Sequence, residues 1–186
     1  KGFTKGTWLI LLCWLVYVCS YIGKLNYTAN ITQIQSYYNV KKASAGLVGT
    51  FFFFSYGVGQ VLNGLLCKKY NIRYIVFGAL LLSGCINLAV AFLKTFSVIK
   101  YLWLVNGFSM SVLWPTLVRL LTENLSREEM PKASIIMGTA VAVGTLFVYG
   151  LSALYVQFAH FKLAFWTAAI VLPSVAVIWM IFYPVL

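Results

Sequence analysis

The sequence predicts an all-α membrane protein with six membrane-spanning helices. Hydrophobic residues occupy 62% of the 186 positions and charged residues only 9%, which is too few charges to cover a soluble surface. Apolar segments recur along the whole chain, and each is long enough for a spanning helix, which takes about 20 residues. Transmembrane β-strands are much shorter and alternate in polarity, which these segments do not. Because every backbone group must be paired inside a membrane, helices are the expected spanning elements.

Charged joints mark the ends of the first three spans. The first span is expected over residues 8–38 and is followed by a pair of lysines. The second, over residues 43–66, leads into the basic segment CKKYNIR. The third, over residues 74–93, ends directly before Lys94.

The last three spans are divided in the same way. The fourth, over residues 99–121, contains Pro115, which lacks a backbone donor and is expected to bend the helix. The segment TENLSREEMPK separates it from the fifth span, over residues 133–158. A short joint around His160, to which we assign no role, precedes the sixth span, over residues 161–185. The six spans are expected to form one bundle over residues 1–186, with both chain ends on the same side of the membrane.

The charges are strongly unbalanced, with a net charge of +11 and three acidic residues, Glu123, Glu128 and Glu129. The basic residues are scattered over short joints, which is not typical of a nucleic-acid surface. We call the side of the N-terminus and of the second and fourth joints the odd end, and the opposite side the even end. The basic residues of the odd end are Lys1, Lys5, Lys68, Lys69, Arg73, Arg127 and Lys132. Those of the even end are Lys41, Lys42, Lys94, Lys100 and Lys162.

This division has two consequences. The slight excess of basic residues at the odd end favours cytoplasmic chain termini in the cell membrane, plasma or bacterial inner, by the positive-inside rule. The even end has basic residues alone, and its field is expected to attract anions.

The sequence offers no catalytic or metal-binding constellation. The four cysteines lie in or at the ends of apolar segments without a CxxC spacing, which is typical of small buried hydrophobic residues. No Ser/His/Asp set, metal-ligand spacing or phosphate-cradling glycine loop occurs. We therefore expect neither an enzyme nor a bound cofactor or metal.

Lys24 is the most informative residue, because it lies deep within the first apolar span. It is about 20 Å from either end of a helix over residues 8–38, which is too far for its stem to reach the membrane surface. A lysine at the centre of a bilayer costs about 2.5–3.5 kcal/mol on insertion scales, so it is expected to face water inside the bundle. Its helical face also carries polar or aromatic residues: Tyr17, Tyr21, Thr28, Thr32 and Gln35. This pattern favours an anion site, and a structural lysine paired with backbone carbonyls or a carboxylate is the alternative.

Arg119 is the second basic residue within a span. It lies near the odd end of the fourth span, four residues before Glu123. A contact with a solute or a gate and an ion pair with Glu123 are both compatible with this spacing.

Three segments resemble the major facilitator superfamily, and most closely its organophosphate:phosphate antiporter family. They are YIGKLNYTANI in the first span, GLLCKKYNIR at the second joint and WPTLVR in the fourth span. The resemblance covers essentially the whole chain. It implies the N-terminal six-helix half of a twelve-helix transporter, built from two inverted three-helix repeats. A C-terminal six-helix half, in the same polypeptide or a second chain, is then the expected partner, together with the lipid bilayer and a small anionic solute.

The resemblance also implies roles for individual residues. Lys24 stands where that family has an arginine that binds a phosphoryl group, and Asn26 matches an asparagine two residues later. Tyr17, Tyr21, Asn26, Thr28 and Arg119 are then expected beside Lys24 in the substrate site. At the second joint, Gly64, Lys69 and Arg73 keep positions of a conformational loop, to which we add Lys68 and Glu123.

Two departures from the family pattern concern the anion. Lysine replaces arginine at position 24, and an ammonium is a point charge rather than a bidentate donor. Val141 stands where the phosphate antiporters have a histidine. Lys68 also replaces the usual aspartate of the loop, which removes a charge that the superfamily uses to latch its two halves.

The residues and the resemblance together predict a secondary transporter that exchanges small organic anions, such as a sugar phosphate, glycerol phosphate or carboxylate. The resemblance implies that it works by rocker-switch alternating access. No carboxylate in these spans is available for a proton relay, which favours exchange. A proton-coupled symporter or drug exporter of the same fold is an alternative, as is a membrane sensor that does not transport.

Overall fold

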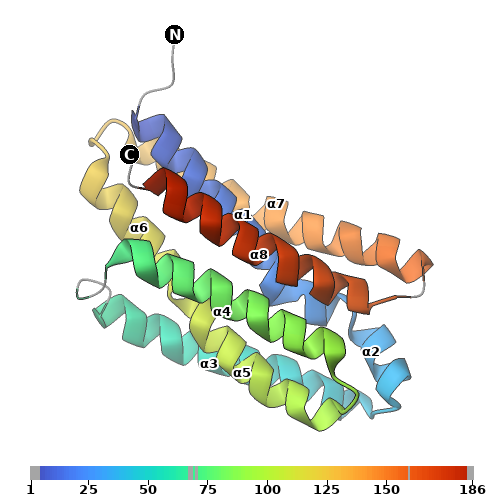
Figure 1. The fold of residues 1–186 in the computed structure, drawn as a ribbon. Helices are drawn as coiled ribbons and strands as arrows, with labels where there is room; N and C mark the ends of the chain where they lie inside the picture. Colours follow the sequence, from blue (N-terminus) through green and yellow to red (C-terminus); the bar gives the residue numbers. More distant parts are fainter. Residues whose placement is uncertain (1–4, 67–68, 70, 159, 184–186) are drawn as a thin grey trace.

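The computed structural model describes residues 5–66, 69, 71–158 and 160–183. Within these ranges the elements are helices that run lengthwise in one bundle (Figure 1). Six segments are long and apolar enough to cross a membrane. The predicted all-α fold with six spans is therefore confirmed.

The first span differs from the single helix expected over residues 8–38. It consists of α1 (Lys5–Ala29) and α2 (Ile31–Tyr38), which are separated at Asn30. The side-chain amide of Asn30 donates to the carbonyl of Asn26, 2.8 Å away, which is the acceptor that its backbone N–H would use in a continuous helix. The backbone N–H of Asn30 bonds instead to Tyr27 O. Lys24 therefore lies between one and two turns before the break.

The next two spans are continuous helices, α3 (Lys42–Leu66) and α4 (Ile72–Phe92). Asn71 caps α4, since its side-chain oxygen accepts from the backbone N–H of Arg73 at 3.0 Å. A short 3-10 helix, η2 (Phe96–Val98), leads into the fourth span.

The fourth span is interrupted, as Pro115 suggested, but the interruption lies three residues earlier. It consists of α5 (Ile99–Ser111) and α6 (Leu113–Asn124), which are separated at Val112. Pro115 thus falls in the first turn of α6, where a missing backbone donor costs little. The fifth and sixth spans are α7 (Met130–Gln157) and α8 (Lys162–Phe182).

The packing pairs follow a repeated pattern. The helix α1 packs against α7 and α8, α5 packs against α3 and α4, and α4 packs against α8. If spans one, two and three are matched in order with spans four, five and six, the α1–α7 pair corresponds to α5–α3. The α1–α8 pair corresponds in the same way to α5–α4. This pattern agrees with two three-helix repeats. The start of α1 and the end of α8 lie at the same end of the bundle (Figure 1).

A buried chain of polar side chains joins three spans near Lys24. The amide of Asn26 donates to Asn87 on α4 at 2.7 Å, and the Ser83 hydroxyl donates to Asn106 on α5 at 2.6 Å. The amide of Asn106 donates in turn to Gly23 O at 2.8 Å. Because a polar group inside a membrane is expensive unless it is paired, these bonds fix α1 against α5 and α4 on either side of Lys24, at Gly23 and Asn26.

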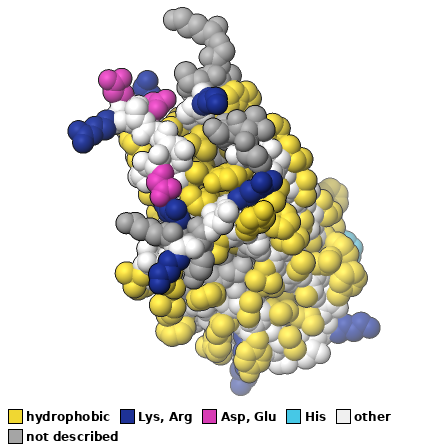
Figure 2. Space-filling view, turned by 60° about the vertical axis from the view of Figure 1, so that its left-hand side comes forward, with side chains coloured by type: hydrophobic (Ala, Val, Ile, Leu, Met, Phe, Trp, Pro, Cys, Tyr) yellow, Lys and Arg dark blue, Asp and Glu magenta, His cyan; other side chains and the backbone are white. Residues whose placement is uncertain are grey.

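The charged side chains gather at the two ends of the bundle. Figure 2 shows the acidic side chains at the upper end of the visible face, and basic side chains without acidic neighbours at its lower end. Between them the surface is largely hydrophobic, as expected for a surface that contacts lipid.

Candidate functional site

The amine of Lys24 is enclosed by three tyrosine rings. It lies 4.5 Å from the ring centre of Tyr17, 4.9 Å from that of Tyr21 and 5.5 Å from that of Tyr56. The side chain is 5% exposed, and its nitrogen has no hydrogen-bond partner among the described residues. An ammonium attracted to ring faces keeps all three of its N–H donors.

The alternative of a structural lysine paired with a carboxylate does not describe this amine. Of the three acidic residues of the chain, Glu123 lies within a span, and its Oε1 accepts from Arg119 Nε at 2.8 Å. Within the described ranges no ion pair reaches Lys24. The burial of an amine without a partner is costly, so the position is typical of a functional group rather than of packing.

Three elements place the rings around the amine. On α1, Tyr21 lies one turn and Tyr17 two turns before Lys24, and their rings meet edge to face with centroids 5.6 Å apart. Tyr17 also packs against Trp114 of α6, at 4.9 Å between ring centres. Tyr56 comes from α3, and its hydroxyl accepts from Gln60 at 3.0 Å.

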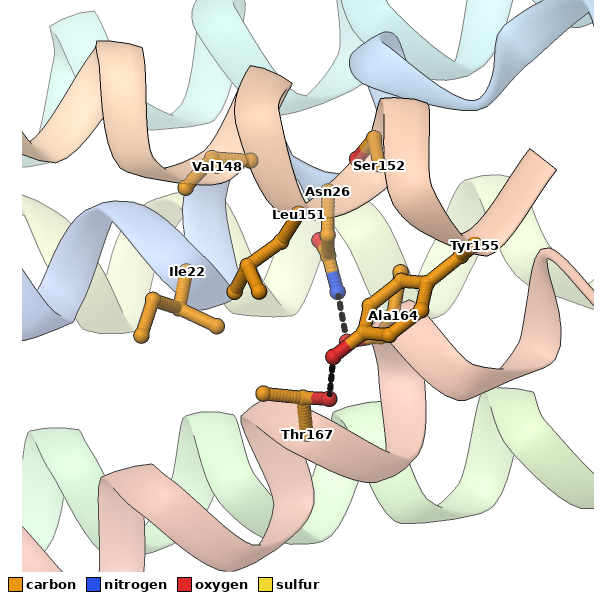
Figure 3. Close-up of a pocket in the computed structure, with 8 residues that line it drawn as sticks. All are labelled: Ile22, Asn26, Val148, Leu151, Ser152, Tyr155, Ala164 and Thr167. Carbon is orange, nitrogen blue, oxygen red and sulfur yellow. Dashed lines mark hydrogen bonds between the residues drawn. The ribbon is translucent and has the colours of Figure 1, made fainter. Parts of the chain in front are cut away.

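Asn26 lies away from this cluster, although the sequence places it two residues after Lys24. It is 1% exposed, and its amide also lies 3.4 Å from Ala164 O of α8. Figure 3 shows it in a small pocket between α1, α7 and α8, beside the Tyr155–Thr167 hydrogen bond of 2.6 Å. The cavity volume of about 10 Å³ suits one water molecule, not a solute. A contact between Asn26 and a solute would require the helix-to-helix bonds to open.

Thr28 lines a different and larger hollow. This groove lies between α1–α2 and α3 and has a volume of about 510 Å³, which falls within the range of small-molecule sites. Gly46 and Gly49 of α3 line this groove without side chains, which leaves space beside them, and Phe53 and Phe54 form one wall.

Arg119 forms the ion pair that its spacing allowed. Its side chain is 21% exposed and that of Glu123 is 48% exposed. The pair supports the structural alternative for Arg119, and a contact with a solute stays a prediction.

The residues predicted at the second joint are only partly described. Gly64 lies in the last turns of α3 and Lys69 is exposed, whereas Lys68 lies outside the described residues. Arg73 lies at the start of α4 and donates from Nη2 to Met180 O of α8 at 3.2 Å. The indole of Trp179 donates back to Arg73 O at 3.0 Å. Arg73 therefore ties the second joint to the end of α8.

Sequence reasoning missed Tyr56 and the buried asparagines Asn87 and Asn106. Tyr56 belongs to another span, and nothing in the spacing of α3 relates it to Lys24. The asparagines carried a usable signal, since each is an amide within an otherwise apolar span, and such residues are expected to face the bundle interior.

Comparison with known proteins identifies relatives of the chain. Residues 13–186 match the sequence profile of the Major Facilitator Superfamily, which confirms the resemblance drawn from the sequence. Membrane sensor protein UhpC of Escherichia coli (strain K12) is 29% identical over 136 residues, covering 73% of this chain and 31% of UhpC. A Probable hexose phosphate transport protein of Chlamydia muridarum (strain MoPn / Nigg) is 24% identical over 164 residues, covering 88% of this chain and 35% of that protein.

A further relative is Protein spinster homolog 1 of Homo sapiens, 29% identical over 119 residues, which are 56% of this chain and 22% of that protein. The hexose phosphate transport protein supports the narrower likeness to the organophosphate:phosphate antiporter family. The chain spans about a third of the length of the sensor and of the hexose phosphate transport protein.

Proposed function

Because the chain belongs to the Major Facilitator Superfamily, we propose that it is part of a secondary transporter that binds a small organic anion at Lys24. The observation that carries this proposal is the buried amine with free donors, held by three tyrosine rings and by no carboxylate. An anion that enters the bundle would supply the hydrogen-bond acceptor that the described residues do not offer to Lys24.

The charge of Lys24 suggests how binding is coupled to movement. A buried ammonium without a counter-ion is unfavourable in a low dielectric, and a bound anion neutralises it. Reorientation of the loaded site therefore costs less than reorientation of the empty site. This difference favours exchange of one anion for another through rocker-switch alternating access, with termini on the cytoplasmic side.

The ligand chemistry fits a phosphate ester. An ammonium donates to any oxygen of a phosphate or carboxylate, and charge-assisted bonds of this kind are the strong ones. The hydroxyls of Tyr17, Tyr21 and Tyr56 add neutral donors beside it. The name of the hexose phosphate transport protein favours a sugar phosphate over a carboxylate. A C-terminal six-helix half, in the same polypeptide or a second chain, would complete the path.

Two other functions are kept as candidates. The relative named as a membrane sensor favours a protein that binds the anion without carrying it. A proton-coupled symporter or drug exporter would need a carboxylate facing the cavity from outside residues 1–186.

Transport by the intact protein in liposomes separates these functions. Vesicles loaded with an unlabelled hexose phosphate should take up the labelled compound by exchange without a proton gradient. Lys24→Gln removes a charged donor worth about 1.5–3 kcal/mol, which corresponds to about 10- to 150-fold weaker binding. Lys5→Gln is the matched control, since Lys5 lies on the same helix and is exposed.

The outcomes are distinct. Binding that depends on Lys24 without uptake would identify a sensor, and uptake that requires a proton gradient would identify a symporter. Binding and uptake that are equal in Lys24→Gln and the wild type would contradict the proposed site.

A further inference from the structure

The even end of the bundle combines basic residues with aromatic residues and has no carboxylate. All three acidic residues of the chain lie at positions 123 to 129, at the odd end. The lysines at the lower end of Figure 2 thus have no acidic neighbour at their own end. Residues 1–186 offer these lysines no acidic counter-ion at this end.

The aromatic residues at this end form a connected cluster. The Tyr37 ring lies 5.2 Å from that of Phe161, and the Tyr38 ring lies 5.7 Å from that of Phe96. The Tyr38 hydroxyl donates to Leu93 O at 2.8 Å, which ties α2 to the end of α4. The cluster therefore joins the ends of three spans into one continuous surface.

Lysines border this aromatic surface where α4 and α8 meet. Lys162 lies one turn before Trp166 on α8, and the Trp166 ring stacks edge to face on Phe92, 5.0 Å between centres. Lys94 follows Phe92 by two residues and is exposed. The Lys162 amine lies 4.9 Å from the ring centre of Tyr37. Tyr37 is 57% exposed, so the amine over its ring lies near the surface of this end.

The outer face of the α4–α8 pair is apolar up to this end. Leu82 and Phe92 on α4 are 45% and 65% exposed, and Ile170 on α8 is 65% exposed. A face of this kind contacts acyl chains. Aromatic residues followed by lysines at the end of such a face are typical of the level of the lipid headgroups.

We propose that the surface formed by Lys94, Lys162, Trp166 and Phe92 binds the headgroup of an anionic glycerophospholipid. The phosphodiester contacts the two amines, and the acyl chains lie on the apolar outer face of α4 and α8. A soluble anion would gain the contact with the amines alone, so this apolar face favours lipid. The proposal does not depend on what Lys24 binds.

The test uses the intact protein, released from nanodiscs that contain equal amounts of phosphatidylglycerol and phosphatidylcholine. Native mass spectrometry counts the lipids that remain bound. The wild type should retain phosphatidylglycerol in preference to phosphatidylcholine. Each lysine near a membrane surface contributes about a fivefold preference for anionic lipid, so Lys94→Gln with Lys162→Gln should weaken retention about 30-fold. Lys5→Gln with Lys132→Gln, at the acidic odd end, is the matched control and should change it little.

A second measurement needs no variant. High salt should reduce the preference of the wild type for phosphatidylglycerol, since the contacts are screened at the surface. Inorganic phosphate at millimolar concentration should not displace the lipid. Equal retention in both double variants, retention that ignores salt, or displacement by free phosphate would each overturn the proposal.

Discussion

Replacing Gly107 with alanine tests the close contact that holds α3 against α5. A Cβ at position 107 would meet the backbone carbonyl of Phe52 and the hydroxyl of Ser55. The carbonyl belongs to the helix itself, so it cannot move without displacing α3. Tyr56 is the next residue on α3 and covers the amine of Lys24, so the contact also positions the site.

The size of the effect follows from a matched pair of glycines. A Cβ at Gly78, in the interior of α4, would have nothing within 4 Å. Both substitutions change helix propensity by the same amount, so that contribution cancels between them. What remains for Gly107→Ala is overpacking, which costs about 1–3 kcal/mol when backbone has to shift. We expect its free energy of unfolding to lie below that of Gly78→Ala by this amount.

Unfolding of the intact protein in mixed micelles, followed by circular dichroism as the fraction of denaturing detergent rises, measures the difference. Gly107→Ala should unfold at a lower fraction than Gly78→Ala, and it should also bind the anion more weakly. Equal midpoints for the two variants would refute the close approach of α3 and α5.

Three further predictions concern single contacts. Tyr56→Leu should weaken anion binding in calorimetry, because Lys24 loses a ring contact worth about 0.5–2 kcal/mol. Tyr56→Phe keeps the ring and should bind the anion more tightly than Tyr56→Leu. The reverse order of these two affinities would argue against the ring contact. Hydrogen bonds from the backbone N–H and the hydroxyl of Ser126 lower the pKa of Glu129 below its ordinary value of 4.5. The Glu129 carboxylate therefore stabilises the turn before α7 at pH values above 4.5. This stabilisation is lost as the pH falls through the lowered pKa. In a carboxyl NMR titration, Ser126→Ala removes the hydroxyl bond but keeps the backbone bond, so the pKa of Glu129 should rise part of the way toward 4.5. An unchanged pKa would exclude the hydroxyl bond. Asn106→Leu removes the partner of the Ser83 hydroxyl and of the Gly23 carbonyl inside the bundle. The free energy of unfolding should therefore fall by about 1–3 kcal/mol, and an unchanged value would rule out the polar chain.

The span pattern could be predicted because the membrane imposes it. Apolar length and charged joints are properties of the sequence alone, and they fixed the number of spans. The break at Asn30 could not be predicted in this way, because it depends on a side-chain amide taking a carbonyl that a backbone N–H would otherwise use. Asparagine is compatible with either arrangement, and the contact with Ser152 of α7 at 2.9 Å decides between them.

The candidate site was predictable only along one helix. Helical spacing placed Tyr17 and Tyr21 on the face of Lys24, and the structure brings all three together. The same argument could not find Tyr56, because its position depends on how α3 packs against α5. Nor could it show that the amide of Asn26 points to α4 and α8, since that orientation is a tertiary contact.

A cryo-electron microscopy structure of the intact protein with a bound sugar phosphate tests the central claim most directly. We predict that a phosphoryl oxygen lies within about 3.2 Å of the Lys24 nitrogen. A ligand bound elsewhere, with the amine still enclosed by Tyr17, Tyr21 and Tyr56, would contradict it.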